Sequence, residues 1–172
     1  MCANFNSLYI AALRAQCTHF LMLSDDVCPI WSPGRSWFHF FAQEFENVGA
    51  EILASVIAIK DAKGRVSTAL ETDDEWRPDV LTLARIKEFG EITFTRPNIL
   101  LNGGLMLWRR APWSEKLCFH FEDRIRDGVV DLKSEDWNFS RDARRAGCPH
   151  HKMFATTILT IDHFGLHRWT TP

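Results

Sequence analysis

An apolar run that stops at two carboxylates constrains the fold more than any other stretch of the chain. Residues 19–23 read His-Phe-Leu-Met-Leu, and Ser24, Asp25 and Asp26 follow directly. Because aspartate is depleted in strand interiors, this pattern predicts a buried strand over 19–23 that carries acidic side chains to the rim of a sheet. Open α/β folds bind their ligands at that rim. We therefore expect an α/β fold with a ligand site at the end of this strand.

A glycine pair interrupts a second apolar stretch. Residues 99–108 are apolar except for Asn102, Gly103 and Gly104. Paired glycines weaken a strand, and they mark places where the backbone must come close to a ligand or to another segment. We expect two short strands here, separated by a close approach.

An acidic pair begins a predicted helix over residues 134–146. Ser134 is a favourable N-cap, and Glu135 and Asp136 stand in the first turn, where carboxylates suit the helix dipole. Capping alone can explain this Ser-Glu-Asp sequence. A functional role for the two carboxylates is the interpretation we favour.

The remaining elements follow from hydrophobic spacing and turn residues. The sequence predicts a hairpin with its turn at 61–64, and a polar, acidic loop over 71–78. Further helices are expected at 4–16, 37–48, 79–89 and 113–127, and further strands at 51–60, 66–70, 129–132 and 156–161.

Composition limits the class of protein and its compartment. The chain has 172 residues, 46% of them apolar, and a net charge of -2, which indicates one globular domain and argues against a protein that mainly grips nucleic acid. The five cysteines show no Cys-x-x-Cys spacing, so we interpret them as reduced thiols. No apolar run is long enough to span a membrane, and no secretory signal is recognisable, so we expect a cytoplasmic protein without a membrane span.

The order of these motifs resembles the nucleotide-sugar-dependent glycosyltransferases of the GT-A fold. The resemblance covers residues 5–169 and includes a histidine after the last predicted strand. It implies a single GT-A-like domain over 1–172, with a Rossmann-like, mixed and largely parallel sheet flanked by helices. Only about 23 residues precede Ser24. We therefore expect the domain to be partial at its N-terminus, without the usual nucleotide-binding portion, and its uncovered sheet edge to favour self-association.

The resemblance implies a metal site around the acidic triplet. Ser24-Asp25-Asp26 stands in the place of the Asp-x-Asp motif, so Asp26 matches the aspartate that binds Mn²⁺ or Mg²⁺ on the donor diphosphate. Ser24 occupies the position where an aspartate is usual, and we expect Ser24 and Asp25 to contact the donor. His163 matches a further metal ligand, with a structural histidine as the alternative.

The resemblance also implies an acceptor side. Residues 102–104 would lie along the donor sugar and the acceptor, and Glu135 and Asp136 would contact the acceptor. A carboxylate within reach of the acceptor hydroxyl can act as a general base, a role we assign to Asp136, with Glu135 second. Trp169 would stack on a sugar or base, or serve only in packing.

The function implied is metal-dependent transfer of a sugar, of the hexosyltransferase type, from a nucleotide-sugar donor to an acceptor hydroxyl. The sequence leaves open the nucleotide, the sugar, the stereochemistry and the acceptor, which could be a glycan, a protein, a lipid or a modified nucleic-acid base. Two alternatives remain. One is a non-catalytic carbohydrate- or partner-binding domain of the same fold, and the other is a metal-dependent hydrolase or nuclease built on a carboxylate cluster.

Overall fold

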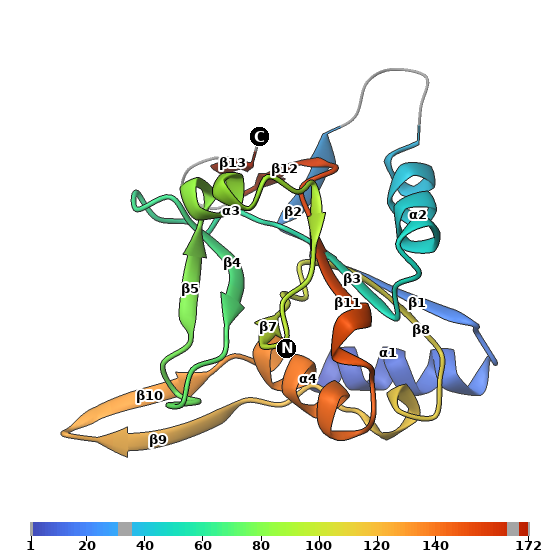
Figure 1. Ribbon diagram of the computed structural model, residues 1–172. Coiled ribbons are helices and arrows are strands. Elements are labelled where there is room, and N and C mark those ends of the chain that lie inside the picture. Colours follow the sequence, from blue (N-terminus) through green and yellow to red (C-terminus); the bar gives the residue numbers. More distant parts are fainter. Residues whose placement is uncertain (1, 31–35, 165–168, 172) are drawn as a thin grey trace.

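The protein has a mixed α/β fold built around a five-stranded sheet (Figure 1). The structure, a computed structural model, describes residues 2–30, 36–164 and 169–171, with the side chains of residues 2 and 169–171 left out. The sheet has the strand order β1 (His19–Leu23), β8 (Leu105–Arg109), β3 (Ile52–Ser55), β11 (Met153–Thr156) and β6 (Thr93–Phe94). The α-helices are α1 (Cys2–Arg14), α2 (Trp37–Asn47), α3 (Leu83–Phe89) and α4 (Glu135–Arg145).

The central sheet is covered on both faces. Along β8, Met106 and Trp108 join an apolar cluster that also contains residues of α1 and α4. Leu105 and Leu107 point the other way, into a second cluster with Phe41 and other residues of α2. Because successive side chains of a strand face opposite sides, a continuous apolar run in β8 is what a sheet buried on both faces requires.

The expected mixed sheet is present, but its strands are not largely parallel. β11 pairs with β3 in parallel, whereas β1 pairs with β8, β8 with β3, and β11 with β6 in antiparallel register. The other described sheets are also antiparallel. β8 is buried on both faces, and such a strand shows the same apolar run in either direction, so its sequence pattern carried no information on direction. The strand expected to be buried at 19–23 is buried on one face only, because β1 lies at the sheet edge and exposes Leu21 and Leu23.

Two smaller sheets flank the central one. β2 (Val27–Ile30) pairs with β12 (Thr160–His163), and β12 also pairs with β13 (Trp169–Thr171). β4 (Arg65–Leu70) lies between β5 (Asp79–Thr82) and β7 (Ile99–Leu100). The single strand expected at 156–161 is therefore two strands, β11 and β12, which belong to different sheets.

Part of the helix expected at 79–89 is a strand. Residues 79–82 form β5, and the helix α3 begins only after Thr82, whose side chain accepts a hydrogen bond from the backbone N–H of Arg85. Gly90 ends α3 in a left-handed conformation, as its sequence position predicted. Pairing with β4 outweighs the helical spacing of residues 79–82.

The prediction of a helix at 113–127 was wrong. This region contains a short 3₁₀ turn, Ser114–Lys116, and the strand β9 (Glu122–Arg126), which forms a hairpin with β10 (Val129–Lys133). Asp127 and Gly128 connect the strands, both with positive φ, 52° and 76°. Asp-Gly favours a two-residue hairpin turn of this kind, so the turn residues decide the structure here against the helical spacing.

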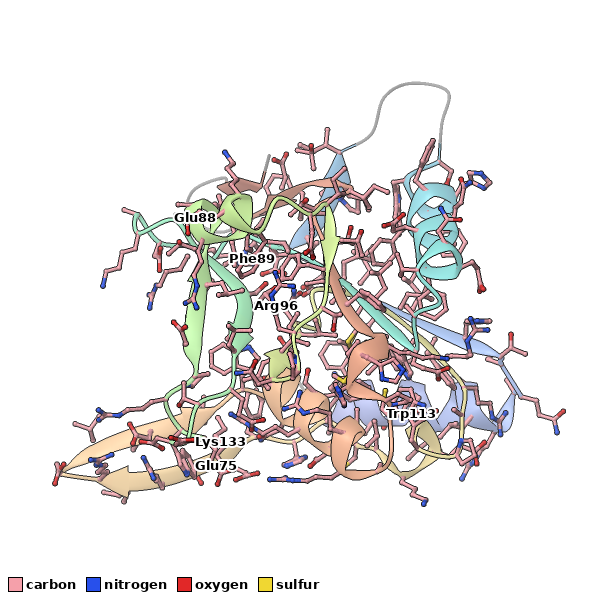
Figure 2. All side chains as sticks on the ribbon, viewed as in Figure 1. Glu75, Glu88, Phe89, Arg96, Trp113 and Lys133 are labelled. Atoms are coloured by element: carbon pink, nitrogen blue, oxygen red, sulfur yellow. The ribbon has the colours of Figure 1, made fainter. Side chains whose placement is uncertain are left out.

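The β9–β10 hairpin extends away from the central sheet (Figure 1). One side packs against the acidic loop 71–78, where Lys133 lies 3.0 Å from a carboxylate oxygen of Glu75 and 4.3 Å from the ring centre of Trp76 (Figure 2). The other side exposes apolar side chains, Ile125 by 81% and Val130 by 62%. Lys133 of the hairpin thus holds the acidic loop through its contacts with Glu75 and Trp76.

Two expectations from the sequence, on membrane spans and on the redox state of the cysteines, can be compared with the described residues. No helix in the ranges that the structure describes has the length and apolar character needed to cross a membrane. The cysteines with described side chains, Cys17, Cys28, Cys118 and Cys148, are free thiols.

Candidate functional site

A cavity of about 210 Å³ gathers most of the residues singled out in the sequence. It lies where β1, β12 and the start of α4 meet the glycine pair that precedes β8. Its walls consist of Phe5, Met22, Ser24, Asp26, Val27, Ile57, Ser67, Asn102, Gly103, Gly104, Glu135, Asp136 and His163. Residues distant in the sequence are therefore brought together as the motif order predicted.

Asp26 forms one wall of the cavity and is held ionised by its neighbours. Its Oδ1 accepts a hydrogen bond of 2.8 Å from the Ser24 hydroxyl, and its Oδ2 accepts one of 2.5 Å from Lys60 Nζ. Burial acts to raise the pKa of Asp26, but the hydrogen bonds from Lys60 and Ser24 and the charge of His163 outweigh it and lower the pKa to about 2. This carboxylate is therefore negative at any physiological pH.

His163 lies beside Asp26 because β12 pairs with β2, with His163 opposite Val27. Its Nδ1 is 2.7 Å from the carbonyl oxygen of Ala58, and since a carbonyl only accepts, Nδ1 carries the proton and donates. Its Nε2 then faces Asp26 Oδ2 at 3.2 Å. A histidine fixed through one ring nitrogen by a backbone carbonyl, with the other nitrogen beside a carboxylate, has the orientation of a metal ligand.

Asp26 Oδ2 and His163 Nε2 are close enough that both could contact one metal ion, with phosphate and water as its further ligands. Mg²⁺ is commonly held by one or two carboxylates together with substrate phosphates and water. Among the side chains that the structure describes, no group of three or more His, Cys, Asp or Glu residues is placed to hold one metal ion. The large carboxylate cluster considered for a hydrolase is accordingly not assembled in this part of the chain.

Lys60 is a site residue that the sequence analysis missed. It follows the strand-like segment after β3, in a turn closed by a hydrogen bond of 2.9 Å from Ile59 N to Arg65 O. Nothing distinguishes this lysine from other lysines in the sequence. Only the folded structure places its ammonium on Asp26, which lies 34 residues away in the chain.

Asp136 lines the same cavity as Asp26, but its pKa is shifted in the opposite direction. The Ser134 hydroxyl caps the helix by accepting a hydrogen bond of 3.3 Å from Asp136 N, so the capping interpretation is correct, and the Asp136 side chain lines the cavity as well. Burial raises the pKa of Asp136 to about 7, with a contribution from the charge of Glu135 and against a hydrogen bond from the Gly103 backbone. Near neutral pH this group can both release and accept a proton.

The two glycines allow the cavity walls to approach closely. A Cβ atom on Gly103 would overlap Met22 Cε and Asp136 Oδ1. One on Gly104 would lie 2.6 Å from Ile57 Cδ1. The glycine pair thus marks a close approach, as predicted from the sequence, and a Cβ at either position would force these side chains to shift.

Asn102 shapes the loop that carries the glycines. Its side chain is buried, its Nδ2 donates to the Ser55 carbonyl at 2.6 Å, and its Oδ1 accepts from Gly104 N at 3.0 Å. Both ends of the amide are thus used within the protein. Asn102 lines the cavity, and its amide also positions the backbone of the glycine pair.

Of the predicted site residues with described side chains, Asp25 does not line the cavity, and it is exposed. Trp169 lies in β13 with its backbone paired to His163, but its side chain is outside the described residues. Glu135 does line the cavity, next to Asp136.

A second, more apolar cavity of about 320 Å³ lies between α1 and β1 and shares Phe5 and Met22 with the first. His19 is its only charged or strongly polar lining residue apart from the Tyr9 hydroxyl, which donates to Ser114 O at 2.7 Å. The smaller cavity carries the paired titratable groups that chemistry requires, and we place the candidate site there.

Comparison with protein-family models finds no match for this sequence, and comparison with curated proteins finds none either. Among solved structures, the chain is similar to A197 from STIV, with a TM-score of 0.50 and 16% sequence identity. The match covers 92% of this chain and 63% of A197. At this identity the similarity concerns the fold alone. This chain spans less than two thirds of the length of that protein.

Proposed function

We propose that this protein transfers a sugar, in the manner of a hexosyltransferase, from a nucleotide-sugar donor to an acceptor hydroxyl, using Mn²⁺ or Mg²⁺. One observation carries the proposal: a single small cavity holds an ionised carboxylate beside a fixed histidine, and also a carboxyl group with a pKa of about 7. Sugar transfer needs both, because a diphosphate must leave with its charge neutralised and an acceptor hydroxyl must lose a proton.

The GT-A-like character of the fold is part of this proposal. Its support is the place of the acidic triplet, directly after the edge strand β1, and of the glycine pair, directly before the neighbouring strand β8. The backbone connects the two motifs, since Ser24 N donates to Gly104 O at 2.8 Å. A cavity of about 210 Å³ is small for a whole nucleotide sugar, so we assign it to the sugar and the diphosphate.

On the donor side, Asp26 and His163 would hold the cation, with Ser24 orienting Asp26 through its hydroxyl. A divalent cation bound there supplies Lewis-acid stabilisation of the leaving diphosphate. His163 is suited to this role because Nδ1 donates to Ala58 O, which directs Nε2 towards Asp26 Oδ2, where a shared cation would bind.

On the acceptor side, Asp136 would accept the proton of the acceptor hydroxyl. The hydroxyl oxygen attacks the anomeric carbon of the sugar, and the bond to the diphosphate breaks with its electrons leaving on the phosphate oxygen. The Gly103 N–H holds the Asp136 carboxylate in place for this transfer, and Glu135 lies next to it. This assignment describes inversion at the anomeric carbon. In a retaining reaction the same two carboxylates would orient the acceptor.

Thermal unfolding in the presence of candidate ligands tests the proposal. A ligand that binds only the folded state raises the midpoint by mass action. We expect one nucleoside diphosphate or its sugar to raise the midpoint only when Mn²⁺ is present, and the shift to disappear in Asp26→Ala. Asp25→Ala is the matched control, since Asp25 is exposed and outside the cavity. Equal shifts in both variants, or no shift with any donor in the wild type, would contradict the proposal.

Turnover distinguishes the enzyme from a binding domain of the same fold. A transferase should slowly hydrolyse its donor when water replaces the acceptor, and Asp136→Asn should abolish this release of sugar. Binding of the donor without any hydrolysis or transfer would instead favour the non-catalytic alternative.

A further inference from the structure

Lys60 is paired with the carboxylate oxygen of Asp26 that a cation shared by Asp26 and His163 would use. Its Nζ is 2.5 Å from Asp26 Oδ2, the same oxygen that His163 Nε2 approaches to 3.2 Å. A divalent metal ion and the Lys60 ammonium on the same carboxylate oxygen would repel each other strongly, since even unit charges 4 Å apart interact by about 4 kcal/mol near a protein surface. A metal ion at Asp26 therefore requires the ammonium of Lys60 to move.

The fold lets this ammonium move while the backbone stays. The turn that carries Lys60 is closed by the Ile59–Arg65 hydrogen bond and by an ion pair of 2.6 Å between Asp61 and Arg65. The Lys60 side chain itself is one third exposed, at 33%. Lysine carries a compact charge on a flexible four-carbon stem, so the ammonium can leave Asp26 by rotation of side-chain bonds alone.

We propose that Lys60 binds the donor diphosphate: without ligand it neutralises Asp26, and when a cation takes its place it transfers its ammonium to the phosphate oxygens. This inference rests on the proposed function of the same cavity. A bare cation must compete with Lys60 for Asp26. A cation that enters with a diphosphate gives Lys60 a new anionic partner, so cation and diphosphate favour each other's binding by the same factor.

Two binding measurements test this role without any need for turnover. The dissociation constant for Mn²⁺ alone is measured from the electron paramagnetic resonance signal of free Mn²⁺, and that for magnesium pyrophosphate by calorimetry. The variants are Lys60→Met, which removes the charge, and Lys60→Arg, which keeps it. Lys63→Met removes a charge from the same turn at an exposed position and is the matched control.

We expect Lys60→Met to change the two affinities in opposite directions. Mn²⁺ alone should bind up to about fivefold more tightly, because the competing ammonium is gone. Magnesium pyrophosphate should bind about tenfold or more weakly, because a charge-assisted hydrogen bond to phosphate is lost. Lys60→Arg should keep pyrophosphate binding within a few-fold of the wild type, and Lys63→Met should match the wild type in both measurements.

The outcomes separate this inference from the function on which it rests. If the wild type binds magnesium pyrophosphate and Lys60→Met binds it equally well, the role of Lys60 is refuted and the proposed function stands. If Lys60→Met weakens both ligands together, Lys60 does not compete with the cation, and the inference fails. If the wild type binds neither ligand at millimolar concentration, the donor site itself is absent and both proposals fall. Circular dichroism spectra of all variants establish that each is folded.

Discussion

Asp26 and Asp136 line the same cavity, and their surroundings move their pKa values in opposite directions. Asp26 accepts hydrogen bonds from Lys60 and Ser24 and faces His163, so its pKa is about 2 despite partial burial. Burial and the charge of Glu135 raise the pKa of Asp136, a hydrogen bond from one backbone N–H lowers it, and the resulting pKa is about 7. Two aspartates of the same intrinsic acidity thus become a permanent anion and a group able to exchange protons near neutral pH.

This difference shows that environment, and not residue type, assigns the two roles. Pairs of carboxyl groups whose pKa values are pushed apart commonly divide acid–base work from charge stabilisation. Asp26 is more exposed and surrounded by donors, which suits an ion that must hold a cation. Asp136 is packed against Gly103 and its charge is disfavoured by burial, which suits a group that must take up a proton.

The largest expected effect comes from removing the basicity of Asp136. Asp136→Asn keeps the size of the side chain but cannot accept a proton, and should lower the transfer rate by about 10²–10⁴-fold. Donor-induced thermal stabilisation should remain, because Asp26 and His163, the residues proposed to hold the cation and the donor, are unchanged. In the wild type, activity should rise with pH up to about 7, as Asp136 loses its proton, and then level off. Activity independent of pH between 5 and 8 would argue against Asp136 as the base.

The next largest effect comes from removing the negative charge of Asp26. Asp26→Asn removes the carboxylate charge and should weaken Mn²⁺ binding in the presence of a nucleoside diphosphate by at least the roughly 10–100-fold seen when a residue that supports a metal ligand is lost. Asp25→Asn should leave the affinity unchanged, because Asp25 does not line the cavity. Titration of both variants by calorimetry makes the comparison. Similar losses in the two would mean that the net charge of the triplet matters, and not the position of Asp26.

Filling the space between the walls should affect stability. Gly103→Ala places a methyl group where Met22 Cε and Asp136 Oδ1 already lie, and should lower the free energy of unfolding by about 1–3 kcal/mol. The double variant Gly103→Ala/Asp136→Ala gives the methyl group room and should recover part of the loss. Urea unfolding measures both. A double variant that is destabilised by the sum of the two single effects would contradict this packing explanation.

The smallest effect is a change in how stability depends on pH. The raised pKa of Asp136 means that the unfolded chain binds fewer protons than the folded one between about pH 4 and 7, so this group makes the wild type less stable as pH rises. Between pH 5 and 8, the free energy of unfolding of Asp136→Asn should rise by about 1–2 kcal/mol relative to that of the wild type. This figure is smaller than the full pKa shift would give, because the side chain is partly exposed. Asp26 has the opposite sign: its stabilisation is present above about pH 4 and is lost as pH falls towards 2. Unfolding midpoints across this range would show both trends.

The sequence predicted well where the physical cause is local. The strand at 19–23 follows from an apolar run bounded by carboxylates, and the cap at Ser134 follows from one hydroxyl at the start of a helix. The glycine pair predicted a close approach because few other causes put two glycines inside an apolar stretch. These signals need no knowledge of what lies opposite in the fold.

The sequence failed where the cause is distant or where two local signals compete. Lys60 acts on a carboxylate far away in the chain, and no pattern in its neighbours reveals this contact. In the β9–β10 hairpin, the Asp127-Gly128 turn decides the structure against the helical spacing from which the helix at 113–127 was predicted. The direction of β1 relative to β8 depends on which strands meet, so it is a property of the whole fold.

The pairing of distant strands also bears on how quickly the cavity can form. β1 pairs with β8 and β2 with β12, so the walls of the cavity join segments that are distant in the sequence. Folding slows as the contacts that define a structure become less local, because long loops must close before those contacts form. We expect refolding to be slow for a chain of this length, and the Asp26–His163 contact to form among the last. Stopped-flow refolding of the wild type and of His163→Ala would then give equal folding rates, with the variant differing only in how fast it unfolds.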